Sequence, residues 1–221
     1  MVPRPDARRA VLCALIVALL FAVVPAWAGQ ASRSMRADTD PRACLDGAIA
    51  AMAAADMEAF ERHVDLETVI AAILPELAAM ATDPDTSKFL PPVVTLLASQ
   101  GVLTNRTMSG VFTREAAEFV RYGVGSGAFG GVPAGDYQGG GLLGPLFGAA
   151  SMGRKEVTWM GAPTYYEDDR ATLPFRVRDH DNDREYDVLG VFSRRDGRLP
   201  KLVGIANLRD LILVICAEMA D

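Results

Sequence analysis

The chain has 221 residues, of which 28 are acidic and 22 are lysine or arginine, so its formal charge at pH 7 is −6. Half of the residues are hydrophobic, and the length suffices for one domain with a substantial core. An acidic chain without a stripe of basic side chains repels phosphate backbones, which excludes nucleic acid as an expected partner.

The first 28 residues have the pattern of a secretory signal peptide. Arg8 and Arg9 precede an apolar core of about 15 residues, and the segment ends with the small-x-small sequence Ala26-Trp27-Ala28. The core is shorter than the roughly 20 apolar residues that a transmembrane helix requires. We therefore expect cleavage after Ala28, which predicts an exported, periplasmic protein with no stable membrane span after processing.

A flexible leader and a helical region are expected next. Residues 29–41 are polar and aperiodic, whereas apolar residues recur at helical spacing over residues 42–123. The strongest apolar stripe runs over residues 66–80, with Asp65 as its predicted N-cap. Pro75 lies inside this stripe and should bend the helix, because proline has no backbone N–H.

Two more helices are predicted before a glycine-rich connection at residues 124–154. One is expected to begin at Pro91-Pro92 and end near Gly101, and the other, with Thr113 as its N-cap, to end at Gly123.

The connection contains G-S-G-A-F-G, a formal match to the G-x-G-x-x-G motif that binds dinucleotides. A helix rather than a strand precedes the match, and no acidic residue follows at the spacing that holds a ribose. We interpret the segment as a flexible crossover. The alternative is a lid over a site, because the segment also carries large apolar side chains.

From residue 155 onward the apolar period changes from 3.6 to 2, which predicts an antiparallel sheet followed by an apolar tail. The expected strands lie in the runs "VTWMGAPTYY", "ATLPFRV", "EYDVLGVFS" and "LPKLVGIAN". Helices followed by strands predict an α+β fold. We therefore expect one domain over residues 42–221, with N-terminal helices packed on a C-terminal four-stranded antiparallel sheet.

Two segments resemble a known family. "LDGAIAAMAAADMEAFERHVDLETVIAAIL" resembles the opening of a bacterial exported family of unknown function. "YDVLGVFSRRDGRLPKLVGIAN" is similar to the closing hairpin of that family and of the wider nuclear-transport-factor-2-like cone folds. The resemblance implies helices that close against a curled sheet and leave a pocket. The family has no known catalytic residues to transfer, and the glycine-rich stretch has no counterpart in it.

Aromatic residues of the predicted sheet are the candidates for ligand binding. Their first expected role is core packing against the helices, because buried aromatic side chains dominate such cores. In a cone-type fold, some of them would line the mouth of the pocket. The candidates are Trp159, Tyr165, Tyr166, Phe175 and Phe192.

Cys44 and Cys216 are the cysteines that remain after the expected cleavage. An even pair in an exported chain predicts a disulfide bond. Two buried free thiols are the alternative, since unpaired cysteine is among the most buried residue types.

No catalytic residue, metal site or cofactor is predicted. His63 and His180 are the only histidines, and neither lies in a nucleophile elbow or at a metal-ligand spacing. The acidic run "RDHDNDREYD" is similar to a calcium loop, but Arg184 stands where the sharp turn needs glycine and Gly190 where the ion needs a bidentate glutamate. We interpret that run as a solvated hairpin.

These patterns predict an exported, non-enzymatic binding protein for a small apolar, lipid-like ligand or for another envelope protein. Two alternatives stay open. One is an envelope hydrolase that uses acids near the sheet, such as those of the run at residues 167–169. The other is a structural or stress-related envelope protein that has no ligand.

Overall fold

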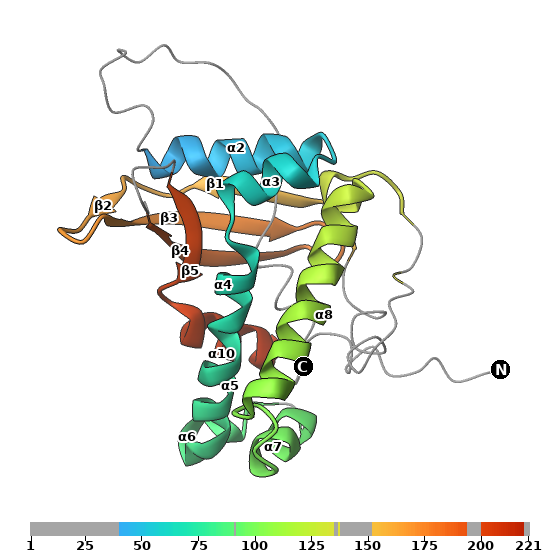
Figure 1. The fold of residues 1–221 in the computed structure, drawn as a ribbon, viewed down its shortest axis with the longest axis vertical. Helices are drawn as coiled ribbons and strands as arrows, with labels where there is room; N and C mark the ends of the chain where they lie inside the picture. The colour runs from blue at the N-terminus through green and yellow to red at the C-terminus, as the bar shows by residue number, and fades with distance from the viewer. Residues whose placement is uncertain (1–39, 91, 135–136, 138–151, 194–199, 219–221) are drawn as a thin grey trace.

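The computed structural model describes residues 40–90, 92–134, 137, 152–193 and 200–218. This part of the chain forms an α+β fold, in which most helices precede an antiparallel sheet (Figure 1). The helices are α2 (Pro41–Ala53), α3 (Met57–His63), α4 (Leu66–Ala71), α5 (Ile73–Thr82), α6 (Pro84–Ser87), α7 (Pro92–Ser99), α8 (Arg106–Gly125), the short 3₁₀ helix η3 (Ala128–Gly130) and α10 (Leu208–Glu218). The strands are β1 (Lys155–Trp159), β2 (Thr164–Tyr165), β3 (Arg170–Asp179), β4 (Arg184–Ser193) and β5 (Lys201–Ile205). The expected signal peptide lies outside the described residues.

Aspartate side chains begin the first helices, where free backbone N–H groups need acceptors. The Asp40 carboxylate accepts from the N–H of Arg42 at 2.9 Å, and Asp65 accepts from that of Thr68 at 3.2 Å, which confirms Asp65 as an N-cap. The long apolar stripe is divided at Ala72 into α4 and α5. This break is the predicted effect of Pro75, which cannot donate a hydrogen bond back to the preceding turn.

One helix boundary was predicted wrongly, and one helix was not predicted. Helix α8 begins at Arg106 with Asn105 as its N-cap in place of Thr113, because the Asn105 side chain accepts from the backbone N–H groups of Thr107 at 3.0 Å and Met108 at 3.1 Å. The apolar tail expected after the sheet is helix α10. Its buried residues Leu208, Leu211, Ile212 and Ile215 recur at helical spacing.

The sheet has five strands rather than the four predicted. Its order is β1-β3-β4-β5, with β2 also paired to β3, and the described pairings between these strands are antiparallel. The extra strand arises because the first predicted run is interrupted between Trp159 and Thr164. Gly161 and Pro163 lie in the interruption, and proline cannot donate a ladder hydrogen bond.

The core lies between one face of the sheet and the helices. Leu173, Phe175 and Val177 of β3 alternate with more exposed neighbours and are buried, as are Tyr186 and Val188 of β4. Helix α2 contacts β3 and β5, and α4 contacts β5 and α8. In Figure 1, α2 runs along the upper edge of the sheet, while α5, α6 and α7 form the lower end of the molecule.

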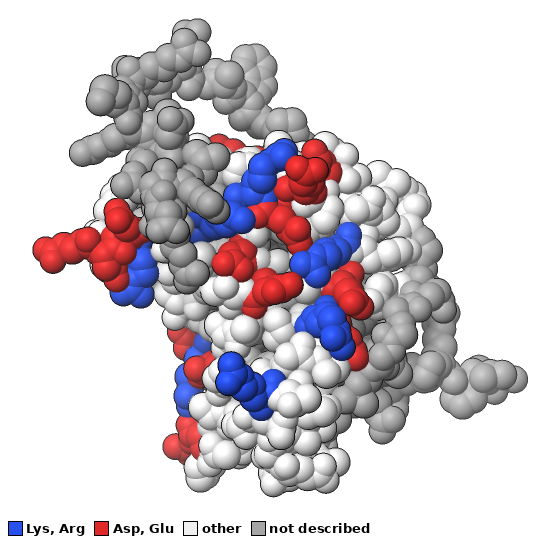
Figure 2. All heavy atoms as spheres, viewed as in Figure 1, with Lys and Arg blue, Asp and Glu red and all other residues white. Residues whose placement is uncertain are grey.

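Acidic and basic side chains lie next to each other on the face shown in Figure 2. Among the described residues, no helix is long and apolar enough to cross a membrane.

Candidate functional site

The sheet brings three of the five candidate aromatic residues to one cleft. Tyr165 of β2 pairs with Ala171 of β3, and Ala171 pairs with Phe192 of β4, so these side chains form one row on the core-facing side of the sheet. The cleft has a volume of about 170 Å³. Its lining residues are Pro41, Tyr165, Tyr166, Asp169, Arg170, Ala171, Phe192 and Pro200.

The cleft has an apolar floor and amphipathic aromatic walls. Phe192 is only 1% exposed, whereas Tyr165 is 60% and Tyr166 is 51% exposed. The β2–β3 turn fixes the walls, because the backbone N–H of Tyr166 donates to the carbonyl of Arg170 at 2.9 Å. The hydroxyl of Tyr166 also lies 3.4 Å from Thr172 Oγ1. We define this group of residues as the aromatic cleft.

The acids beside the aromatic cleft belong to a tight turn. Asp169 has a φ of 56°, in the left-handed region, and Asp168 accepts from Arg170 Nε at 2.5 Å. The ion pair between Asp168 and Arg170 is largely exposed to solvent, with side-chain exposures of 52% for Asp168 and 57% for Arg170. Charges of both signs therefore lie at the rim of the cleft, while its floor is apolar.

Trp159 and Phe175 face each other in the β1–β3 register but do not line the aromatic cleft. Phe175 is 2% exposed and belongs to the core, which confirms its expected packing role. Trp159 is 43% exposed and lies 5.3 Å below the Arg42 guanidinium, which donates to the Gly161 carbonyl at 3.0 Å. A hydrogen bond joins Trp159 to the carboxyl group of Asp46. Burial raises the pKa of Asp46, and the bond to Trp159 partly opposes this shift.

The predicted disulfide bond is wrong. Cys44 and Cys216 are both free, buried thiols. Cys44 belongs to α2 and Cys216 to α10, and Figure 1 shows these helices at the upper and the lower side of the sheet. The sequence identified an even pair but could not show that its members lie on helices at different ends of the core.

Cys44 also has no activated partner. Its Sγ donates to the backbone carbonyl of His63 at 3.3 Å, and burial raises the pKa of the thiol to about 12. Burial lowers the pKa of His63, and the nearby Arg62 and Lys201 lower it further. A neutral thiol that donates to a backbone carbonyl lacks the thiolate that nucleophilic catalysis by cysteine requires.

His180 forms an acid–imidazole contact at the start of the β3–β4 hairpin. Its Nε2 lies 2.9 Å from Glu156 Oε2, and Arg154 Nη2 lies 3.8 Å from the same oxygen. All three side chains are about one-third exposed. This contact is the arrangement closest to an acid–base pair for the hydrolase alternative.

The acidic run at residues 179–187 does not converge on one point. Arg178 binds Asp183 at 2.5 Å, Arg176 binds Asp187 at 2.6 Å, and Asp179 faces the core. Among the residues that the structure describes, no three acidic, histidine or cysteine side chains are grouped so that they could hold a metal ion.

A buried ion pair that the sequence did not reveal lies at the edge of the core. Lys155 Nζ lies 2.7 Å from Asp179 Oδ1, and both side chains are fully buried. Their residues are paired across β1 and β3, and Lys155 lies 5.9 Å from the centre of the Phe129 ring. Burial lowers the pKa of Lys155, while Asp179 opposes that shift. Only the strand register brings these residues together, so no local pattern predicts the pair.

The glycine motif is a packing feature at the end of α8. Gly125 ends the helix, Gly127 has a φ of 76°, and Phe129 in the 3₁₀ turn is fully buried. A Cβ atom on Gly123 would overlap the Phe129 ring, so glycine is needed there for close approach. The start of the predicted flexible crossover is therefore packed, while residues 135–136 and 138–151 lie outside the described residues.

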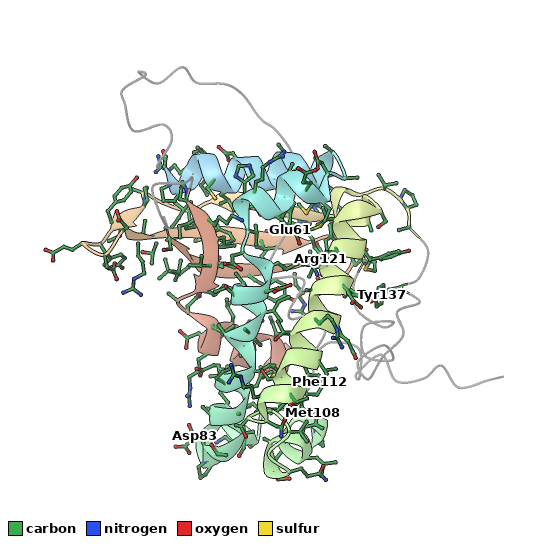
Figure 3. All side chains as sticks on the ribbon, viewed as in Figure 1. Glu61, Asp83, Met108, Phe112, Arg121 and Tyr137 are labelled. Atoms are coloured by element: carbon green, nitrogen blue, oxygen red, sulfur yellow. The ribbon has the colours of Figure 1, made fainter. Side chains whose placement is uncertain are left out.

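A second hollow of about 210 Å³ is rich in charge. Arg121 of α8 points toward Glu61 of α3 (Figure 3), and its Nε lies 2.8 Å from Glu61 Oε1. Arg121 also reaches Glu67 at 3.4 Å, and Lys201 Nζ donates to the backbone carbonyl of Glu61 at 2.6 Å. These bonds join α3, α4, α8 and β5, which indicates a bracing role rather than a site for a charged ligand.

Comparisons of the chain with protein-family models, curated proteins and solved structures find no match.

Proposed function

We propose that the chain is an exported, non-enzymatic binding protein, and that the aromatic cleft holds a small apolar group. The observation that carries the proposal is the row of Tyr165, Ala171 and Phe192 on the core-facing side of the sheet, in which the exposed Tyr165 borders the buried Ala171 and Phe192. Tyrosines at such a boundary offer a ring face to an apolar group and a hydroxyl to water.

The size of the cleft limits the ligand. An apolar cavity of about 150 Å³ accommodates one benzene ring, so a cleft of about 170 Å³ accommodates one ring or a short alkyl segment. A whole lipid would extend beyond it. We infer that the site holds one apolar end of a ligand, while the rest lies outside near Arg170 and Asp169.

The contacts of the titratable groups support binding rather than catalysis. The Cys44 thiol is held neutral, and the carboxylates of the hairpins are paired with arginines rather than with each other. The hydrolase alternative would have to rely on the solvent-exposed Glu156–His180 contact. The cone-type shape and the exported location stay part of this proposal.

Binding of the uncharged fluorescent probe N-phenyl-1-naphthylamine tests the cleft. Tyr165→Ser should weaken probe binding at least tenfold, because it removes one aromatic wall and leaves the core intact. Phe89→Ser is the matched control, since Phe89 is 47% exposed and does not line the cleft. Absence of saturable binding, or equal loss in both variants, would contradict the proposal.

A second candidate is a protein partner that covers the same end of the sheet. Trp159, Met160, Tyr165 and Tyr166 are each more than 40% exposed and lie within eight residues, which is typical of an interaction surface. A photo-crosslinker at Met160 distinguishes the two functions in the native compartment. Crosslinks to one protein that disappear with Tyr165→Ser favour a partner, and crosslinks to lipid-sized molecules favour a ligand.

A further inference from the structure

Strand β4 extends beyond its neighbour on one side. It has ten residues, but β5 pairs only with Gly190–Ser193 at its C-terminal end. The chain leaves β5 at Ala206 and turns into α10, so within the described part of the chain no strand accompanies the other end of β4 on this side. This end of β4 is a free sheet edge, and such an edge can pair with another chain.

The side chain of Asn207 marks where the free edge begins. Its Oδ1 accepts from the backbone N–H of Leu189 at 2.8 Å, and its Nδ2 donates to the carbonyl of Asp187 at 2.9 Å. The N–H of Ala206 donates to the carbonyl of Leu189 at 2.8 Å. The amide of Asn207 therefore occupies the place of one strand residue.

These bonds determine which backbone groups face outward. In an antiparallel ladder, alternate residues bond to opposite neighbours. Because the N–H of Leu189 and the carbonyl of Asp187 bond away from β3, the N–H of Asp187 and both backbone groups of Glu185 point in the same direction. They face the gap beside α10.

A groove of about 450 Å³ lies along this edge, and we call it the β4–α10 groove. Its lining residues are Arg176, Glu185, Tyr186, Asp187, Asn207, Asp210, Leu211 and Val214. Val214 is 48% exposed, so part of the wall is apolar and accessible.

The charge of the groove is acidic. It contains three carboxylates and one guanidinium, that of Arg176, which binds Asp187 at 2.6 Å and Glu185 at 3.3 Å. The side chains of Glu185 and Asp187 are 46% and 58% exposed, so they stay available to a cation.

We propose that the β4–α10 groove binds an extended basic peptide segment of a partner protein, which adds a strand to the free edge of β4. Both main-chain groups of Glu185 and the N–H of Asp187 supply the pairing, and the excess of carboxylates selects lysine or arginine. This site is separate from the aromatic cleft, because the two lie at opposite ends of β4.

Fluorescence anisotropy with labelled model peptides tests the proposal. The alternating peptide Lys-Val-Lys-Val-Lys-Val should bind, and its Glu-Val counterpart should bind at least tenfold more weakly. Two analogues carry N-methyl groups on either the lysines or the valines, which removes alternate backbone donors without changing the protein. At least one analogue should lose tenfold or more in affinity, whereas purely electrostatic attraction would spare both.

Variants of the protein give an independent readout. Glu185→Gln combined with Asp210→Asn removes two groove charges and should weaken the Lys-Val peptide about tenfold. Glu118→Gln, an exposed substitution on α8 outside the groove, should leave binding unchanged. Lack of binding at millimolar peptide, equal affinity for both N-methylated analogues and the parent, or equal effects of groove and control variants would overturn the assignment. Sedimentation that shows pairing of two copies through this edge would also overturn it.

Discussion

Replacing Lys155 with methionine should destabilise the domain strongly. The substitution leaves the Asp179 carboxylate in a fully buried position without the ammonium group that lies 2.7 Å away. Breaking a buried ion pair by removing one partner costs about 3–5 kcal/mol. Typical domains have a free energy of unfolding of about 5–15 kcal/mol, so the loss would be a large share of the total.

A second substitution separates charge burial from packing. Lys155→Met with Asp179→Asn removes both charges, and the asparagine keeps an oxygen for the backbone N–H of Asp181, which donates to Asp179 Oδ1 at 3.1 Å. The double variant should therefore be more stable than Lys155→Met by about 1–2 kcal/mol, because no charge is left buried alone.

The single variant Asp179→Asn tests the direction in which the loss of stability changes with pH. Burial already lowers the pKa of Lys155, and loss of the carboxylate that opposes this shift lowers it further. A neutral amine needs no counter-charge, so the deficit of Asp179→Asn should be largest near pH 7 and shrink toward pH 10. Urea unfolding followed by circular dichroism at both pH values measures all three variants. A loss below about 1 kcal/mol for Lys155→Met, or strictly additive effects in the double variant, would refute the reasoning.

Three further predictions follow from single contacts. Gly123→Ala should destabilise the domain by about 1–3 kcal/mol in thermal unfolding, because the added Cβ would overlap the Phe129 ring. Gly125→Ala is the control and should be neutral or stabilising, because its Cβ would meet no atom within 4 Å. Cys44 and Cys216 should both be alkylated by iodoacetamide in unreduced, denatured protein but should resist it in the native state at pH 8. Burial raises the pKa of the two thiols to about 12 and about 11, respectively. A peptide mass that shows the two cysteines linked would contradict this prediction. Asp83 has a lowered pKa because it accepts from the N–H of Asp85 and from Arg209. Its contribution to the free energy of unfolding is therefore fully present above the unfolded carboxyl pKa of about 4 and is lost as the pH falls through the folded pKa. Acid unfolding of Asp83→Asn should therefore show a flatter pH dependence than that of the native chain, and identical curves would exclude the contribution.

The order of helices and strands was predictable because it depends on local periodicity. Asp65 and Pro75 acted as expected, since a cap and a missing N–H affect only their own turn. The α10 helix was missed although Leu208, Leu211, Ile212 and Ile215 have helical spacing, because a short apolar run after strands is ambiguous without its packing partner.

The site depends on register, which local patterns do not determine. The aromatic residues were identified as a group, but their division into a buried Phe175 and exposed tyrosines depends on how far the helices cover the sheet. The Lys155–Asp179 pair and the Cys44–Cys216 separation likewise depend on contacts between segments that are distant in sequence.

The contacts of the last strand and the last helix bear on how the chain acquires its structure during synthesis. Lys201 binds the carbonyl of Glu61, 140 positions earlier, and Arg209 reaches back to Asp83 across 126 positions and to Glu76 across 133. A ribosome releases residues 61–83 well before residues 201–209, so these contacts form late in synthesis. Closing such long loops before their contacts form makes folding slow. During that interval the parts of α4 and α5 that contact β5 and α10 in the folded domain stay uncovered.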